Sequence, residues 1–208
     1  MKNPLRYQMS EYDCGPTTLL NGISYLFERE EIPPELIRNV MLFCLDCYGS
    51  DGISGKNGTS RTAMLFLNNW LNSFGQAGRL TVSSSYLSGE KVWMGTDSRI
   101  YDALRRKGAA VVRLFFDVEH YVLLTGVEED RVYMFDPYYM DPEVPYAPED
   151  ILCTQEHPFS YNRIVPFSYL NQENGELYSL GPVKDREAVL LFNETSVLTP
   201  EKTIEYFI

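Results

Sequence analysis

One cysteine stands where proteins often place a reactive thiol. Cys14 follows Asp13 and precedes Gly15-Pro16, and an apolar helical segment begins at this turn. The N-terminal end of a helix favours a thiolate, because the helix dipole is positive there. A free cysteine is more commonly a small buried apolar side chain. The tight loop-to-helix turn nevertheless favours a nucleophile at Cys14.

A thiol nucleophile needs a base, and the chain has two histidines, His120 and His157. His120 opens an apolar segment typical of a β-strand, whereas His157 lies in a proline-bounded loop. Asp136 ends the next β-rich segment, and neighbouring strands lie about 5 Å apart. Its carboxylate can therefore reach the imidazole of His120 and fix the tautomer. A structural histidine and an Asp-Pro turn are the alternative interpretations of these two residues.

The stabilisation of an oxyanion needs a hydrogen-bond donor near the nucleophile. Gln8 lies six residues before Cys14, and its side-chain amide is a candidate, together with the backbone N–H of Cys14. A surface glutamine is the alternative interpretation of Gln8. Asp13 is expected to cap the helix and to take no catalytic role.

These motifs resemble peptidase family C39, a family of papain-like cysteine peptidases. The likeness is carried by Gln8, Asp13-Cys14-Gly15-Pro16-Thr17, His120-Tyr121-Val122-Leu123-Leu124, Val132 and Asp136-Pro137. It implies a papain-like fold and a stand-alone peptidase without transporter segments, with catalytic roles for Cys14, His120, Asp136 and Gln8. The mature-papain signature C-G-[SA]-C-[WY] is absent. Residues after Met140 have no counterpart in the resemblance.

The composition argues against several other classes of protein. The chain has 208 residues, of which 44% are apolar and 23% are charged, as in an ordinary folded domain. The net charge of -11 disfavours nucleic acids and anionic membranes, since the longest basic cluster is Arg105-Arg106-Lys107. No apolar run approaches the ~20 residues that span a bilayer. We expect a cytoplasmic protein with reduced thiols, no cofactor, and a peptide or protein substrate.

A second cysteine pattern is compatible with metal binding. Cys44 and Cys47 form a C-x-x-C, and Cys153 with His157 completes a possible Cys₃His zinc set. Cys44 and Cys47 are predicted to lie in mid-helix on an apolar face, and prolines flank the other pair. We therefore expect no zinc site, and no redox pair because no βαβ pattern surrounds the motif.

Helical periodicity dominates the first half of the chain and strand patterns the second, which predicts an α+β fold with N-terminal helices packed on an antiparallel sheet. In the second helix an apolar stripe is expected to face inward. Two glycines, Gly75 and Gly108, are expected to end the third and fourth helices. Predicted helices are 14–30, 35–48, 60–74 and 97–107. Predicted strands are 80–87, 109–116, 121–127, 131–135, 164–169 and 187–192. The inward-facing apolar stripe of the predicted helix 35–48 consists of Leu36, Ile37, Val40, Met41 and Cys44.

Two segments are distinguished by their composition. Residues 49–59 contain four glycines and are expected to form a mobile surface loop, which we interpret as a gate bordering the cleft. Residues 140–208 are punctuated by prolines and are expected to pack on the sheet, so that residues 1–208 form a single domain. This segment is rich in tyrosines: Tyr146, Tyr161, Tyr169, Tyr178 and Tyr206.

Three functions are compatible with these residues. A peptidase would hydrolyse a thioester acyl-enzyme formed on Cys14. An acyltransferase or amide-bond-forming enzyme would pass the same acyl group to an amine. A binding module would grip peptides without cutting them, although the presence of Cys14, His120, Asp136 and Gln8 together disfavours it.

We expect iodoacetamide to alkylate Cys14 at about pH 6 much faster than Cys44, Cys47 or Cys153. Among these thiols, only Cys14 is expected to be a partly exposed thiolate. Mass spectrometry of each cysteine-containing peptide against time gives the four rates. Equal rates, or a fully protected Cys14, would contradict the peptidase assignment.

Overall fold

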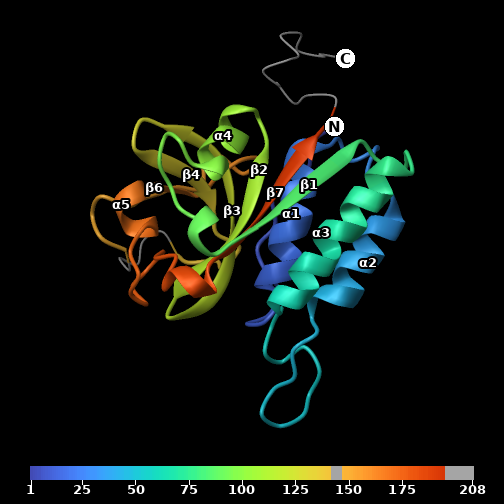
Figure 1. The fold of residues 1–208 in the computed structure, drawn as a ribbon, viewed down its shortest axis with the longest axis horizontal. Helices are drawn as coiled ribbons and strands as arrows, with labels where there is room; N and C mark the ends of the chain where they lie inside the picture. Colours follow the sequence, from blue (N-terminus) through green and yellow to red (C-terminus); the bar gives the residue numbers. More distant parts are fainter. Residues whose placement is uncertain (142–146, 195–208) are drawn as a thin grey trace.

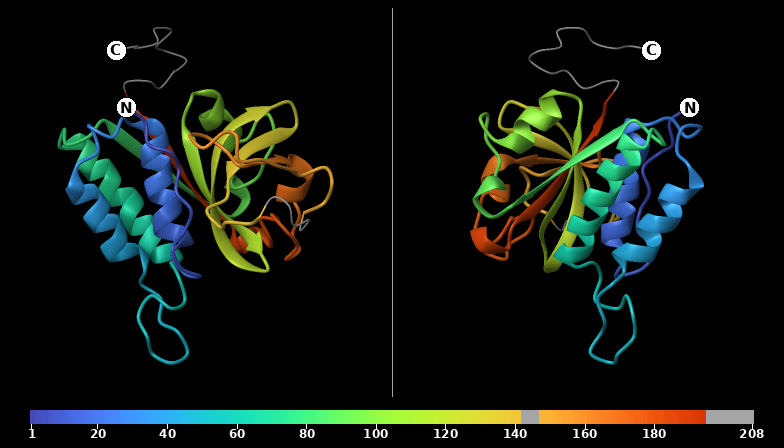
Figure 2. Two further views of the ribbon diagram at one scale, coloured as in Figure 1. Left: turned by 180° about the vertical axis from the view of Figure 1, so that it is seen from behind. Right: turned by 45° about the vertical axis from the view of Figure 1, so that its right-hand side comes forward.

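Three helices pack on one side of a strongly twisted antiparallel sheet (Figure 1). The computed structural model describes residues 1–141 and 147–194; Tyr146 and Tyr206, named above, lie outside these ranges. The α+β class predicted from the sequence is confirmed. Figure 2 shows the same helical layer from two further directions.

The predicted elements occur in the predicted order with shifted ends, except that residues 167–169 of the predicted strand 164–169 belong to a helix, and the short strand 152–153 was not predicted. The α-helices are α1 (Cys14–Leu26), α2 (Pro34–Cys44), α3 (Arg61–Gln76), α4 (Arg99–Arg105) and α5 (Phe167–Leu170). The strands are β1 (Val82–Ser88), β2 (Ala109–Phe116), β3 (Val118–Glu128), β4 (Arg131–Phe135), β5 (Leu152–Cys153), β6 (Arg163–Pro166) and β7 (Glu187–Asn193). The 3₁₀ turns η1 (Gly89–Lys91) and η2 (Val183–Asp185) complete the described elements.

Helix α1 is fastened to strand β3 by side chains that cross the interface. Thr18 Oγ1 donates to the carbonyl of Tyr121 at 2.9 Å, and the Tyr25 hydroxyl donates to the carbonyl of Thr125 at 2.9 Å. Gly22 allows the close approach, since an added Cβ would lie 2.6 Å from Leu191 Cδ1. Together these contacts fix the position of α1 along β3.

The predicted inward stripe of α2 is wrong at two positions. Leu36, Val40 and Cys44 are fully buried, whereas Ile37 is 46% exposed and Met41 is 36% exposed. The buried residues recur every four positions, so the helix presents only a narrow stripe to the core. Ile37 and Met41 instead line a pocket of about 400 Å³ beside α1.

The predicted glycine end of α3 is also wrong, whereas Gly108 does close α4, because its N–H donates to the Ala103 carbonyl at 2.9 Å. Gly75 lies inside α3, where an added Cβ would meet Val82 O at 2.0 Å, and Gly108 lies against Leu191 O at 2.8 Å. Close packing against the sheet, which sequence pattern does not reveal, therefore explains both glycines. The left-handed residues after the helices are Gly78 (φ 69°) and Lys107 (φ 61°).

Strand β7 occupies an inner position although it comes last among the described strands. The sheet order is β1-β7-β2-β3-β4-β6-β5, so β7 pairs with both β1 and β2. One core lies between the sheet and α1–α3, and a second fills the opposite face of the sheet. Alternation along β3 places Leu123 in the first core and Val122 and Leu124 in the second.

The glycine-rich segment forms a loop that projects beyond the ends of α2 and α3 (Figure 1). The two ends of the loop are joined by a hydrogen bond from the Cys47 N–H to the Gly58 carbonyl, at 3.3 Å. Asp46 accepts from both the N–H and the hydroxyl of Ser60, which caps α3. The gating function stays a prediction.

No helix among residues 1–141 and 147–194 is long and apolar enough to span a bilayer.

A chain ending at Met140 should be insoluble or unfolded. The truncation removes β6 and β7. The loss of β7 would separate β1 from β2 and expose the apolar side chains on both faces of the sheet. Solubility and the cooperativity of thermal unfolding, measured beside the full chain, check this. A soluble, cooperatively melting and thiol-reactive fragment would show that the C-terminal part is a separate appendage.

Candidate active site

Cys14 is the first residue of α1, at the end that carries the positive pole of the helix dipole. It is 8% exposed, so the expectation of a partly exposed thiol is corrected to a buried one. The Thr59 hydroxyl packs against Gly15, the residue after Cys14, since a Cβ added to Gly15 would lie 2.2 Å from Thr59 Oγ1. The C-terminal end of the glycine-rich loop, residues 49–59, therefore lies against the turn that carries the Cys14 thiol.

Asp13 occupies the cap position, but its carboxylate does not accept from a backbone N–H of the helix, as the predicted cap would require. It accepts instead from the N–H groups of Met9 (2.9 Å) and Ser10 (2.6 Å), and from the hydroxyls of Ser10 (2.5 Å) and Thr17 (3.2 Å). Burial acts to raise the pKa of Asp13, but these hydrogen bonds outweigh it and lower the pKa. The carboxylate thus ties the segment after Gln8 to α1.

His120 and Asp136 form a buried pair on neighbouring strands. His120 Nε2 lies 2.8 Å from Asp136 Oδ1, with His120 5% exposed and Asp136 fully buried. The Cys14 side chain acts on the same imidazole and raises its pKa. Because Nε2 is hydrogen-bonded to the Asp136 carboxylate, Nδ1 is the ring nitrogen of His120 that can face the Cys14 sulfur.

The charge on His120 is set by these two neighbours. Burial alone lowers its pKa, but the hydrogen bonds to Asp136 and Cys14, and the negative charges of both, raise it to about 10. The ring is therefore an imidazolium at neutral pH. Such a cation beside a thiol stabilises the thiolate form.

The carboxylate of Asp136 is surrounded by donors. Oδ1 also accepts from the N–H of Tyr138 at 2.8 Å, and Oδ2 accepts from the hydroxyl of Tyr178 at 2.9 Å. Burial acts to raise the pKa of Asp136, but the bond to His120, the charge of His120, the Tyr138 N–H and the charge of Arg163 lower it. The carboxylate therefore stays ionised inside the protein.

The backbone of Asp136 is held by one side chain. The Asp136 N–H donates to Asn162 Oδ1 at 2.8 Å, and Asn162 Nδ2 donates to the Asp136 carbonyl at 2.8 Å. Asn162 is 1% exposed and lies beside the start of β6. This reciprocal pair satisfies buried backbone groups that would otherwise cost ~1–3 kcal/mol each.

Gln8 lies beside the pair through its backbone, since its N–H donates to the Pro137 carbonyl at 2.8 Å. Its side-chain Nε2 donates to the Ser10 carbonyl at 2.7 Å, which leaves one amide N–H for another acceptor. Gln8 Oε1 is buried and accepts no hydrogen bond from the described residues. The oxyanion role of Gln8 is a proposal developed below.

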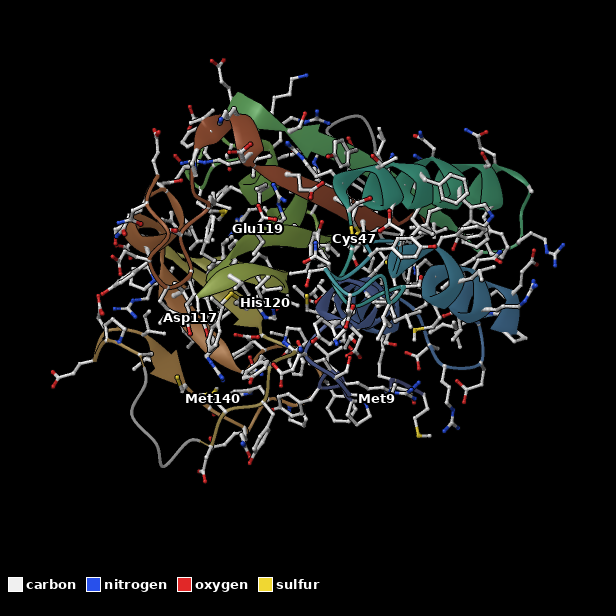
Figure 3. The ribbon with its side chains drawn as sticks, turned by 90° about the horizontal axis from the view of Figure 1, so that it is seen from below. Met9, Cys47, Asp117, Glu119, His120 and Met140 are labelled. Carbon is white, nitrogen blue, oxygen red and sulfur yellow. The ribbon has the colours of Figure 1, made fainter. Side chains whose placement is uncertain are left out.

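Residues of both halves of the molecule surround His120 in the view from below (Figure 3). Asp117 and Glu119 flank it on the β2–β3 hairpin, Met140 lies on the sheet side, and Cys47 and Met9 lie on the helical side. Glu119 is anchored by Arg113, whose Nη1 lies 2.9 Å from Glu119 Oε2. Asp117 and Glu119 are exposed, and the charge of Glu119 is paired with that of Arg113.

The remaining thiols and His157 lie in other surroundings. Cys44 is fully buried at the last residue of α2, and burial raises its pKa well above the usual range. Cys47 lies beyond the helix, which corrects the mid-helix prediction, and burial also raises its pKa. His157 is exposed and stacks on Tyr161, with ring centroids 4.3 Å apart. Among the described residues no three His, Cys, Asp or Glu side chains form a metal cluster.

The sequence analysis missed the residues that support Asp136. Asn162, Arg163 and Tyr178 come from the segment for which no motif was available, and no fixed spacing relates them to Asp136. The one usable signal was a polar pair, Asn162-Arg163, directly before the apolar segment of β6. Nothing in the sequence indicates that Tyr178 is fully buried.

Comparison with known proteins found no matching family model and no matching curated protein. The chain is structurally similar to a double glycine motif protease from an AMS/PCAT transporter, solved in complex with the leader peptide. The TM-score is 0.36 and the identity 15%, over 91% of this chain and 89% of that chain. At this level the similarity decides no residue's role, and the proposals below depend on contacts within the chain itself.

The stabilising effect of His120 should be lost at high pH. The pKa of His120 is about 10 in the folded protein against an ordinary value of 6.5, so the folded state binds the proton more tightly. The stabilisation is complete below 6.5 and is lost as the pH rises through about 10. The difference in unfolding free energy between wild type and His120→Gln should therefore shrink by at least ~1 kcal/mol from about pH 6 to about pH 10.

Urea unfolding of both proteins at several pH values measures this difference. His157→Gln is the matched control, because its ring is exposed and lies outside the pair. A difference for His120→Gln that does not change with pH would contradict the raised pKa.

Proposed function

We propose that the protein is a cysteine peptidase that cleaves peptide bonds through a thioester acyl-enzyme on Cys14. The observation that carries the proposal is the buried pair of His120 and Asp136, together with the effect of Cys14 on the pKa of the same imidazole. The motif resemblance to peptidase family C39 supports it independently. Cys14, His120, Asp136 and Gln8 are the proposed catalytic group.

The nucleophile in this proposal is the Cys14 thiolate, paired with the imidazolium of His120. The helix N-terminus and the adjacent cation both favour the negative charge on sulfur. The sulfur attacks the carbonyl carbon of a peptide bond, and the electron pair moves onto the carbonyl oxygen. The free amide N–H of Gln8 and the backbone N–H of Cys14 are the proposed donors to that oxyanion.

His120 then acts as the acid and afterwards as the base. Its Nδ1 proton passes to the leaving amine as the C–N bond breaks and the thioester forms. The neutral imidazole next takes a proton from water, whose oxygen attacks the thioester and releases the acid product. Asp136 keeps the ring oriented and stabilises the imidazolium throughout.

The acceptor in the second half of the reaction separates this proposal from acyl transfer. Water gives a carboxylic acid, whereas an amine acceptor would give a new amide from the same thioester. A non-cleaving peptide-binding module would form neither product.

Cleavage should depend on His120 and not on His157. We expect His120→Ala to lower kcat/KM for a cleaved peptide by at least ~10³, because both proton transfers use its ring. His157→Ala should leave the rate unchanged. Gln8→Ala should lower kcat by about 10²-fold with KM nearly unchanged, because its donor acts on the oxyanion. Gln76→Ala, at the exposed far end of α3, is the matched control.

The measurement is mass spectrometry of a mixed peptide library incubated with each variant in ¹⁸O-labelled water. A labelled carboxylate in the products identifies hydrolysis, and an amide product in the presence of added amine identifies transfer. Peptides that bind without any product from wild-type protein would indicate the binding module and overturn the proposal.

A further inference from the structure

The carboxylate of Asp136 is held from two sides. Oδ1 faces His120 and the Tyr138 N–H, whereas Oδ2 receives the hydroxyl of Tyr178 at 2.9 Å. We propose that Tyr178 is a positioning residue of the active site, whose hydroxyl keeps Asp136 rotated so that Oδ1 meets His120 Nε2. This inference rests on the proposed function and deepens it.

The direction of the hydrogen bond from Tyr178 follows from its other neighbour. Arg163 Nε lies 3.3 Å from the phenolic oxygen, and a guanidinium can only donate. The phenol therefore accepts from Arg163 and turns its own hydrogen toward Asp136 Oδ2. A phenol polarised by a cation is a stronger donor, so the pair stabilises the carboxylate more than the phenol alone would.

The tyrosine is itself fixed by its backbone. Tyr178 is fully buried and has φ 62°, a left-handed conformation that non-glycine residues seldom adopt. Its N–H donates to the Phe115 carbonyl at 2.8 Å, and the Phe115 N–H donates to the Ser179 carbonyl at 2.9 Å. These bonds at the end of β2 hold the ring where its hydroxyl reaches Asp136. A strained backbone that its surroundings maintain is common at functional sites.

Several groups among residues 1–141 and 147–194 lie around the pair of His120 and Asp136. Cys14 on α1 faces His120, Arg163 on β6 acts on Asp136, and the rings of Phe116 and Tyr138 lie against the imidazole at centroid distances of 5.9 and 6.4 Å. Among the described residues, Tyr178 is thus the neutral side chain that donates to the carboxylate opposite His120.

The test is the rate of Cys14 alkylation by iodoacetamide as a function of pH, which needs no known substrate. Tyr178→Phe removes one donor and keeps the ring. We expect the rate at about pH 6 to fall about tenfold, the usual effect of one hydrogen bond to a charged group. The acid limb of the profile should move to higher pH, because the ionised form of Asp136 loses a donor. Tyr169→Phe, whose hydroxyl binds exposed Asp150, is the matched control.

A double-mutant cycle separates positioning from general destabilisation. If Tyr178 acts through Asp136, then Tyr178→Phe should cost nothing further in an Asp136→Asn background. Additive losses in the cycle would overturn the inference. If Tyr178→Phe fails to melt cooperatively, 3-fluorotyrosine at position 178 keeps the shape and strengthens the donor, and it should move the acid limb to lower pH. An unchanged limb with that variant would also overturn the inference.

The outcomes also separate the two proposals. Wild-type Cys14 that reacts no faster than Cys153 would refute the proposed function. A selectively reactive Cys14 whose rate and pH profile do not respond to Tyr178→Phe would refute the role of Tyr178 alone.

Discussion

A carboxylate with no exposed surface, Asp136, is the constraint on which the site depends. A buried charge is costly unless it is paired and hydrogen-bonded, so the protein must supply donors from several directions. It does so from β3, from the turn after β4 and from the C-terminal part of the chain. These donors restrict the orientation of the carboxylate, and the carboxylate in turn orients the imidazole.

The position of the thiol follows from a second constraint, the docking of α1 on β3. The bond from Thr18 to the Tyr121 carbonyl joins one helical turn after Cys14 to the residue after His120. A slip of either element along the other would break this bond and the pairing of thiol and imidazole together. The geometry of the site is therefore a property of the packed helix and sheet.

The sequence predicted the components of the site better than their surroundings. The pairing of His120 with Asp136 could be predicted because a β-hairpin brings the two residues together by local rules. The exposure of Ile37 and Met41 was not predicted, because apolar periodicity does not distinguish a core from a surface pocket. Gly75 was misread because its need for space arises from the packing of β1 on α3, which the sequence pattern does not reveal. Tyr178 was missed because only the tertiary fold brings it to Asp136.

The inner position of β7 has a consequence for how the protein is made. Tyr86 and Glu187, joined by a hydrogen bond across β1 and β7, are 101 residues apart in the sequence. Contacts of such separation form late and slow folding. On the ribosome, α1 and the β2–β3 hairpin emerge long before β7, and so does the thiol before Tyr178. A nascent chain would therefore carry the Cys14 thiol for most of synthesis before β7 completes the sheet that holds His120 and Asp136.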